Sequence, residues 1–237
     1  MLNQFSRTEL LIKKEGMDIL KNKKIIIFGI GGVGGYVCEA LARSGISHFT
    51  LVDNDNVSIT NINRQIIATM DTIGRSKVDV MAERILSINP DCIIEKRNCF
   101  YLPENAKSFD FSLYDYIVDC VDTVTAKISI IEEAKNKNIP IISAMGAGNK
   151  MNPLMLEVSD ISKTSVCPLA KVMRYELRKR GINHLKVVYS KEEPIKIEEK
   201  LEDSNKRTTP GSISFVPSTM GLIIASEIIK DLINYNK

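Results

Sequence analysis

The chain has 237 residues, of which 44% are apolar, and a formal net charge of +3 at pH 7. Its length allows a sizeable core and suits one elaborated α/β domain. The small net charge gives no general sign of nucleic-acid binding, so any RNA site has to be a local patch. The most apolar stretch, residues 213–229, is interrupted by Pro217 and Glu227. We expect a packing helix there and no transmembrane segment, with peripheral membrane contact as the alternative.

The chain has no C-x-x-C pair among its cysteines, which are Cys38, Cys92, Cys99, Cys120 and Cys167. We expect buried thiols in a reducing compartment. The first sixteen residues lack an apolar core followed by a small-residue cleavage site, so no export signal is expected. These features predict a cytoplasmic location.

A cluster of glycines follows the first predicted strand. Residues 5–20 predict a helical arm, and residues 25–28 form a continuous apolar run, typical of a strand buried on both faces of a parallel sheet. Apolar residues at helical spacing then predict a helix that begins within the cluster. The glycines are Gly29, Gly31, Gly32 and Gly34. A turn without side chains presents backbone N–H groups at a helix N-terminus, which is a site for phosphate.

The second predicted strand, residues 48–52, ends at an acid. Asp53 at its tip can accept hydrogen bonds from ribose hydroxyls, so the unit predicts a nucleotide site. The glycines read G-x-G-G-x-G, which argues against a redox dinucleotide. Arg64 offers a planar fork of donors suited to phosphate oxygens, and can stabilise charge that develops on a triphosphate. The polar residues that accompany it are Asp55, Asn61 and Gln65.

A lysine stands at the start of the next predicted helix. Ser76 can cap that helix, whose apolar face extends over residues 78–88. Lys77 falls in the first turn, where a cation opposes the helix dipole. Helix stability does not explain this position, so a ligand role is favoured over that of a surface lysine.

Further strands are predicted at residues 92–94, 116–121, 140–144, 156–158, 185–189 and 213–216. Open α/β sheets bind ligands at the carboxyl ends of their strands, near a switch in strand order. Asp122 follows the strand at 116–121 and is therefore placed to meet the nucleotide, where a carboxylate can hold magnesium. The alternative is an N-cap for a helix at residues 124–137.

Several motifs resemble a known family. The runs G-x-G-G-x-G and D-x-D-x-V-x-x-x-N-x-x-R-Q, with the lysine of GRSKV, are similar to the adenylating superfamily of ThiF, MoeB and the ubiquitin-activating enzymes. The stretches FSRTELLI, VDTVTAK, SAMGAGNK and SVCPLAKVMRYELRKRG resemble one branch, the tRNA threonylcarbamoyladenosine dehydratases. That branch uses ATP to cyclise the threonylcarbamoyl group on a tRNA adenosine.

The resemblance covers nearly the whole chain and implies one ThiF-like adenylation domain over residues 1–237. The expected fold is an α/β, Rossmann-like, doubly wound and mostly parallel sheet, with an N-terminal helical arm and a C-terminal extension. Residues 22–150 would form the nucleotide-binding core, and residues 151–237 a substrate-side extension. We expect a mobile loop at residues 190–211, which is dense in charge, and a C-terminal helix.

The resemblance also implies roles for individual residues. Arg64, Lys77 and Asp122 would be catalytic, with Asp122 on magnesium. Arg7 would reach across a homodimer to the partner's ATP phosphates; a solvated arginine is the alternative. The residues implied in ATP binding are Gly29, Gly31, Gly32, Gly34, Asp53, Asp55, Asn61, Arg64, Gln65, Lys77 and Arg7. A monovalent cation, sodium or potassium, would bind near residues 145–150, where simple turn chemistry is the alternative.

The basic helix expected within residues 165–181 is the best local candidate for contacts with tRNA phosphates, against the alternative of a solvated face. Three functions are therefore weighed: an ATP-dependent tRNA-modifying cyclase, an activator of a small sulfur-carrier protein, and a non-catalytic nucleotide sensor or NAD-binding module. The lack of a C-x-x-C pair, and of any cysteine in residues 190–211, favours the first. Whether a sulfur-relay partner exists is left open.

Overall fold

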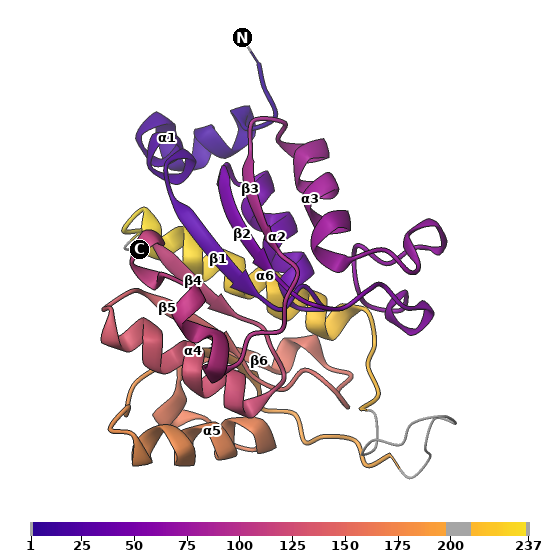
Figure 1. Ribbon diagram of the computed structural model, residues 1–237, viewed down its shortest axis with the longest axis vertical. Helices are drawn as coiled ribbons and strands as arrows, with labels where there is room; N and C mark the ends of the chain where they lie inside the picture. The colour runs from indigo at the N-terminus through magenta and orange to yellow at the C-terminus, as the bar shows by residue number, and fades with distance from the viewer. Residues whose placement is uncertain (1, 198–209, 236–237) are drawn as a thin grey trace.

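The computed structural model describes residues 2–197 and 210–235. Within these residues a seven-stranded sheet has the order β3-β2-β1-β4-β5-β7-β6, and only β6 runs antiparallel to its neighbour (Figure 1). The strands are β1 (Lys24–Phe28), β2 (His48–Val52), β3 (Ile93–Arg97), β4 (Tyr116–Asp119), β5 (Ile141–Ala144), β6 (Leu156–Asp160) and β7 (Lys186–Ser190). The predicted doubly wound, mostly parallel α/β fold is confirmed.

Helices cover both faces of the sheet. They are α1 (Ser6–Lys21), α2 (Gly34–Arg43), α3 (Lys77–Ile88), α4 (Val124–Asn136), α5 (Pro168–Lys179) and α6 (Phe215–Leu232). One core cluster joins α1, α2, α3 and α6 to one face, and a second joins α4 and α5 to the other. Along β1, Ile25 and Ile27 belong to the first cluster and Ile26 and Phe28 to the second, which explains why the run is continuously apolar.

The strand order reverses direction at β1. This strand pairs with β2 on one side and with β4 on the other, and Phe28 aligns with both Val52 and Asp119. The loops that leave these three strands therefore meet at one point on the carboxyl edge of the sheet. Such a switch point is where open α/β sheets bind ligands.

The C-terminal part of the chain completes the sheet that the nucleotide unit begins. Strands β6 and β7 continue it beyond β5, and α6 packs against α2 on the face of the sheet that the first core cluster covers (Figure 1). The contact is close at Gly221, where an added Cβ would lie 2.5 Å from the carbonyl oxygen of Val33. The extension therefore packs directly on the segment that follows the glycine turn.

The strand predicted at residues 213–216 is wrong. Phe215 and Val216 instead begin α6, and Pro217 falls in the first turn of that helix. A proline is tolerated there because the first backbone N–H groups of a helix have no acceptor within it. The last two residues of the predicted strand therefore belong to the helix itself.

Other element boundaries differ by a few residues. The N-terminal arm is broken at Lys13, whose φ of 61° and ψ of 176° are not helical. Strand β3 begins one residue later than predicted and extends to Arg97, while β4 ends at Asp119 and leaves Cys120 and Val121 in a loop. Within the predicted mobile loop, Ser190 still belongs to β7, and residues 198–209 lie outside the described residues. No described helix has the length and apolar character to cross a bilayer.

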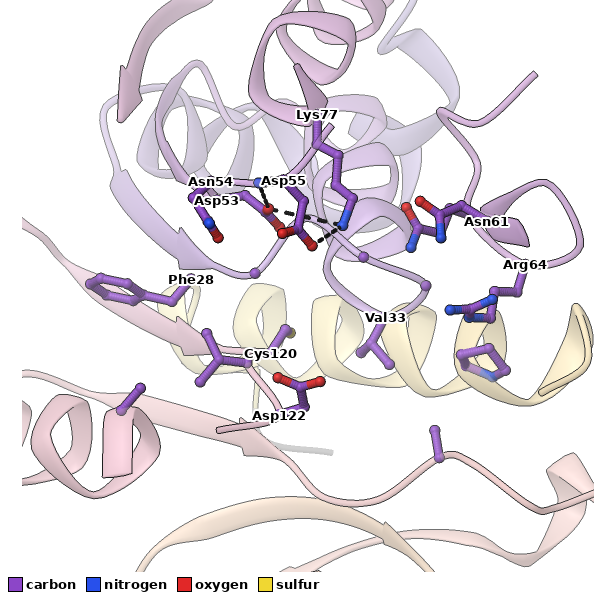
Figure 2. A pocket seen from close by; sticks show the side chains of 18 of the residues that line it. Phe28, Val33, Asp53, Asn54, Asp55, Asn61, Arg64, Lys77, Cys120 and Asp122 are labelled. Atoms are coloured by element: carbon purple, nitrogen blue, oxygen red, sulfur yellow. Dashed lines mark hydrogen bonds and ion pairs between the residues drawn. The ribbon is translucent and has the colours of Figure 1, made fainter. Parts of the chain in front are cut away.

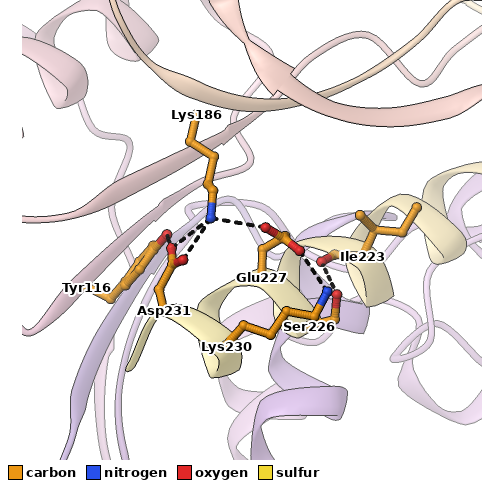
Figure 3. A network of polar contacts seen from close by, with 7 residues as sticks. All are labelled: Tyr116, Lys186, Ile223, Ser226, Glu227, Lys230 and Asp231. Atoms are coloured by element: carbon orange, nitrogen blue, oxygen red, sulfur yellow. Dashed lines mark hydrogen bonds and ion pairs between the residues drawn. The ribbon is translucent and has the colours of Figure 1, made fainter. Parts of the chain in front are cut away.

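A polar network joins the end of α6 to the sheet (Figure 3). Lys186 on β7 donates to both oxygens of Asp231, at 2.8 and 2.9 Å, and pairs with Glu227 at 3.0 Å. The hydroxyl of Tyr116 on β4 donates to Asp231 at 2.7 Å. Burial acts against the charged form of Glu227, but Lys230 and Lys186 outweigh it and lower the pKa of this carboxyl.

Replacing Lys186 by Met removes the cation at the centre of this network. We expect the free energy of unfolding at pH 7 to fall by about 1–2 kcal/mol, because two carboxylates lose a charge-assisted partner. Glu227 has a lowered pKa in the folded state, so its contribution is present above its ordinary pKa and is lost as the pH falls through the folded value. The difference between wild type and Lys186→Met, measured by urea unfolding, should therefore shrink in acid. An equal difference at pH 7 and at pH 3 would contradict this account.

Candidate active site

The glycine turn after β1 is held by two close backbone approaches. Gly29 has a φ of +88°, and an added Cβ would lie 2.8 Å from the carbonyl oxygen of Cys120. At Gly34, the first residue of α2, a Cβ would lie 1.9 Å from the carbonyl oxygen of Gly29. The residue before the helix, Val33, makes no side-chain cap, which leaves the N-terminus of α2 available to an anion.

A cavity of about 380 Å³ lies at this turn, between the carboxyl ends of β1, β2 and β4. Most of the site residues expected from the sequence line it. Those residues are Gly29, Gly31, Gly32, Asp53, Asp55, Asn61, Arg64, Gln65, Lys77 and Asp122. Gly34 and Arg7 are not among the lining residues; Gly34 is required for the close backbone contact, and Arg7 is exposed on α1.

Two carboxylates face the buried lysine at the start of α3 (Figure 2). The ammonium of Lys77, which is 5% exposed, lies 2.7 Å from Asp55 Oδ2 and 3.9 Å from Asp53 Oδ1. Asp53 also accepts from the backbone N–H of Ile30 at 2.6 Å, which ties β2 to the glycine turn. Burial raises the pKa of Asp53, and the charge of Lys77 opposes that shift.

Arg64 is the other cation of the pocket. Its Nη1 atom donates to the carbonyl oxygen of Thr60 and to Asn63 Oδ1, both at 2.9 Å. Within the described part of the chain no carboxylate forms an ion pair with it, unlike Lys77. Partial burial lowers the pKa of the guanidinium. An arginine held by neutral oxygens keeps its charge for an anionic ligand.

Two amide side chains complete this wall. Asn61 Oδ1 accepts from the backbone N–H of Ser58 at 3.1 Å, which orients the side chain. Gln65 is 6% exposed, and its Oε1 atom has no hydrogen-bond partner among the described residues. A buried, unpaired oxygen in a cavity wall indicates that a ligand or water completes its bonding.

Asp122 enters the cavity from the side opposite Asp53 (Figure 2). The N-cap of α4 is Thr123, so the alternative in which Asp122 caps this helix is not realised. The carboxylate of Asp122 is exposed and stands below the glycine turn. Its placement leaves it available to a ligand.

Two parts of the cavity wall were not predicted from the sequence. An apolar part, which can accept a planar base, is formed by Phe28, Val52, Cys99, Phe100, Tyr101, Val121 and Ala126. The aromatic pair Phe100–Tyr101, which begins three residues after the end of β3, was the available signal for this part. A second part comes from residues 210–212 and Pro217 of the extension, and Asn63 Nδ2 donates to the carbonyl oxygen of Ser212 at 2.9 Å. Nothing local in the sequence indicates a contact between segments so far apart.

Comparisons with known proteins agree with this geometry. The model of the ThiF family matches residues 5–237. The chain belongs to the ThiF family. It is 45% identical to the tRNA threonylcarbamoyladenosine dehydratase of Bacillus subtilis over 98% of this chain and 96% of that protein. It is 38% identical to the dehydratase of Escherichia coli, over 74% of this chain and 65% of that protein.

Solved structures of ThiF-family proteins share the fold. The crystal structure of the E. coli dehydratase TcdA in complex with ATP has a TM-score of 0.87 and 33% identity, and covers 98% of this chain and 94% of its own. The complex of the same protein with AMP has a TM-score of 0.89 and 32% identity, with the same coverage. The family expected from the motifs, and its dehydratase branch, are confirmed.

Two glycines of the turn allow a matched test. Gly34→Ala should lower the free energy of unfolding by several kcal/mol or prevent folding, because its Cβ would overlap the carbonyl oxygen of Gly29. At Gly31 the nearest atom to an added Cβ is 3.8 Å away, so Gly31→Ala should fold as the wild type does. Gly31 and its neighbour Gln65 both line the cavity, so the added methyl group should weaken ATP binding about tenfold, measured by calorimetry. Equal stability of the two variants would refute the close contact.

Proposed function

We propose that this protein is an ATP-dependent dehydratase that activates the carboxylate of threonylcarbamoyladenosine in tRNA and cyclises it to the hydantoin form. The observation that carries the proposal is the full-length match to a dehydratase, combined with a cavity that gathers the glycine turn, three acids and two cations. The cavity also suits ATP in its chemistry, with apolar surface at one part and a helix N-terminus at another.

The reaction needs no nucleophile from the protein. An oxygen of the substrate carboxylate attacks the α-phosphorus of ATP, the bond to the leaving pyrophosphate breaks, and an acyl-adenylate forms. A nitrogen of the same substrate group then attacks the activated carbonyl carbon, closes the ring, loses its proton and expels AMP. Orientation of the two reactants and stabilisation of phosphate charge are the contributions left to the protein.

Each residue of the cavity suits one part of this task. The backbone of the glycine turn and the N-terminus of α2 would hold phosphates. Asp53 accepts hydrogen bonds from the backbone N–H groups of Ile30 and Asp55, and its two oxygens retain further lone pairs for the ribose hydroxyls. Arg64 would stabilise charge on the α-phosphate and the leaving pyrophosphate. Lys77 would exchange part of its contact with Asp55 for a phosphate oxygen, since the two carboxylates already hold its ammonium at the turn.

Asp122 suits magnesium. Among the described residues, no group of three or more His, Cys, Asp or Glu side chains could hold a metal ion. Mg²⁺ at a nucleotide site is usually bound by one or two carboxylates with phosphates and water, so a single acid fits. Magnesium would neutralise phosphate charge there, and Asp122 would fix its position relative to the glycine turn.

A monovalent cation, sodium or potassium, suits the loop that follows β5. Asn149 has a φ of 59°, and its buried Oδ1 atom has no partner among the described residues. Its backbone N–H donates to the carbonyl oxygen of Gly211 at 2.8 Å, so the loop is joined to the extension. A buried, unpaired carbonyl oxygen is a chemically suitable ligand for such an ion.

Contacts with tRNA phosphates are assigned to α5. Lys171 and Arg178 lie two turns apart on one exposed face, and neither has an acidic partner among the described residues. Other cations of this helix are already satisfied: Lys179 and Arg180 pair with Glu176. The RNA-binding charge of the helix is therefore smaller than its sequence suggests.

The proposal includes a homodimer. On α1, Leu10 and Leu11 are 84% and 81% exposed, and a second copy would cover this apolar surface. Arg7, exposed on the same helix, would then serve the partner's ATP site. A cytoplasmic location is inferred from the five cysteines, all of which are free thiols. A sulfur-relay partner remains outside the proposal, because no described feature selects one.

Activation of a sulfur-carrier protein is the weaker alternative. The adenylyltransferase and sulfurtransferase MOCS3 of Drosophila sechellia is 33% identical over 58% of this chain and only 30% of its own length. The dehydratase of B. subtilis instead matches both proteins almost completely. Release of pyrophosphate separates either enzyme from a nucleotide sensor, and hydantoin formation on tRNA identifies the dehydratase.

Arg64→Ala tests the adenylation step. Hydantoin formation on modified tRNA, measured by mass spectrometry of the nucleosides, should slow about 100- to 1,000-fold, as is usual when one donor to developing charge is removed. Thermal unfolding should change little, because Arg64 forms no ion pair within the described residues. The control is Arg75→Ala, which loses only an exposed pair with Glu83 and should retain full turnover. Undiminished turnover by Arg64→Ala would remove Arg64 from the mechanism.

Reversal of two charges tests the surface assigned to tRNA. The double variant Lys171→Glu, Arg178→Glu should raise the KM for tRNA about tenfold, and the effect should decrease as salt is added. The affinity for ATP should stay unchanged. Lys107→Glu, an exposed charge reversal in the short helical turn Pro103–Ser108, is the control. A KM for tRNA that equals that of the control would exclude α5 from the interface.

A further inference from the structure

A fully buried lysine lies directly beneath the cavity, outside its lining. Lys127 is the fourth residue of α4 and is 0% exposed. Its ammonium contacts three oxygens: Asp119 Oδ2 at 2.9 Å, the carbonyl of Val121 at 3.1 Å and the carbonyl of Ala144 at 2.8 Å. These oxygens belong to the ends of β4 and β5 and to the loop between β4 and α4.

Its partner, Asp119, is the last residue of β4 and is also 0% exposed. The carboxylate accepts from the hydroxyl of Ser143 on β5 and, at 3.3 Å, from the backbone N–H of Val121. The residue before Asp122 is therefore held at both its N–H and its carbonyl oxygen by one ion pair. The same pair holds the carbonyl of Ala144, after which the chain enters the cavity wall at Ala147 and Gly148.

Stability alone does not account for this arrangement. Removing a carboxylate and an ammonium from water is costly, and apolar residues of similar size are often as stabilising as a buried ion pair. What the charges supply is directional contacts: the ammonium satisfies oxygens of two strands and one loop together. Neither side chain touches the cavity, so neither can contact the nucleotide.

We propose that Lys127 and Asp119 are positioning residues that hold Asp122 and the loop after β5 in the positions that the reaction requires. The inference rests on the proposed function for its catalytic part only. Because most of the cavity wall is built by other segments, the pair acts mainly on the rate of the chemical steps and less on ATP affinity. Misplacement of a reacting group by about 1 Å can cost about 100-fold in rate.

The test removes both charges together. Lys127→Met alone leaves the Asp119 carboxylate buried without a cation, and we expect this variant to be less stable than wild type. The double variant Lys127→Met, Asp119→Asn has no charge at either position and should fold. For the double variant we expect ATP affinity by calorimetry within threefold of wild type and a kcat about 100-fold lower. Lys186→Met is the matched control, since it breaks an ion-pair network far from the cavity and should keep its kcat.

A second measurement does not depend on the reaction. Hydrogen exchange in the double variant should accelerate in residues 119–124 and 144–150 and stay unchanged in β1 and α2, while Lys186→Met should leave both segments protected. A folded double variant with wild-type kcat, or without faster exchange in these segments, would overturn the inference. If the wild type forms no hydantoin, the proposed function fails, and the exchange data still decide whether the pair positions the two segments.

Discussion

The close contact between the first glycine turn and the end of β4 is the constraint on which the site depends. Gly29 passes so near the carbonyl oxygen of Cys120 that a Cβ would lie 2.8 Å from it, and Gly34 passes even nearer to Gly29. These close approaches place the N-terminus of α2 at the carboxyl edge of the sheet. The point of contact is also the switch in strand order, so the loops after β1, β2 and β4 bring helix N–H groups, Asp53 and Asp122 around a single cavity.

The two basic side chains of the cavity differ in the groups that hold them. Lys77 is buried and held by two acids from the end of β2, so its position is determined before any ligand arrives. Arg64 is held by neutral oxygens from its own segment and retains an uncompensated charge within the described structure. A fixed cation can orient a phosphate, while an uncompensated one can respond to charge that develops in the transition state.

The C-terminal extension forms part of the cavity wall. Helix α6 meets the start of α2 at Gly221, and residues 210–212 with Pro217 close one part of the cavity. The network around Lys186 anchors the other end of α6 to β4 and β7 (Figure 3). The N-terminal end of this helix therefore contributes to the cavity wall, while its C-terminal end contributes to fold stability.

The sequence by itself determined the local chemistry: the βαβ unit, the glycine turn, and the acids and cations that follow it at short range. These could be read because their signals, apolar periodicity and motif spacing, act over a few residues. Only the tertiary structure decided that β1 lies between β2 and β4, that Thr123 and not Asp122 is the N-cap residue of α4, and that Phe215 and Val216 begin a helix. It also decided the partners of Lys127 and the contact of Asn63 with Ser212. Strand order, burial and contacts between distant segments follow from the packing of the whole chain, which local sequence patterns do not encode.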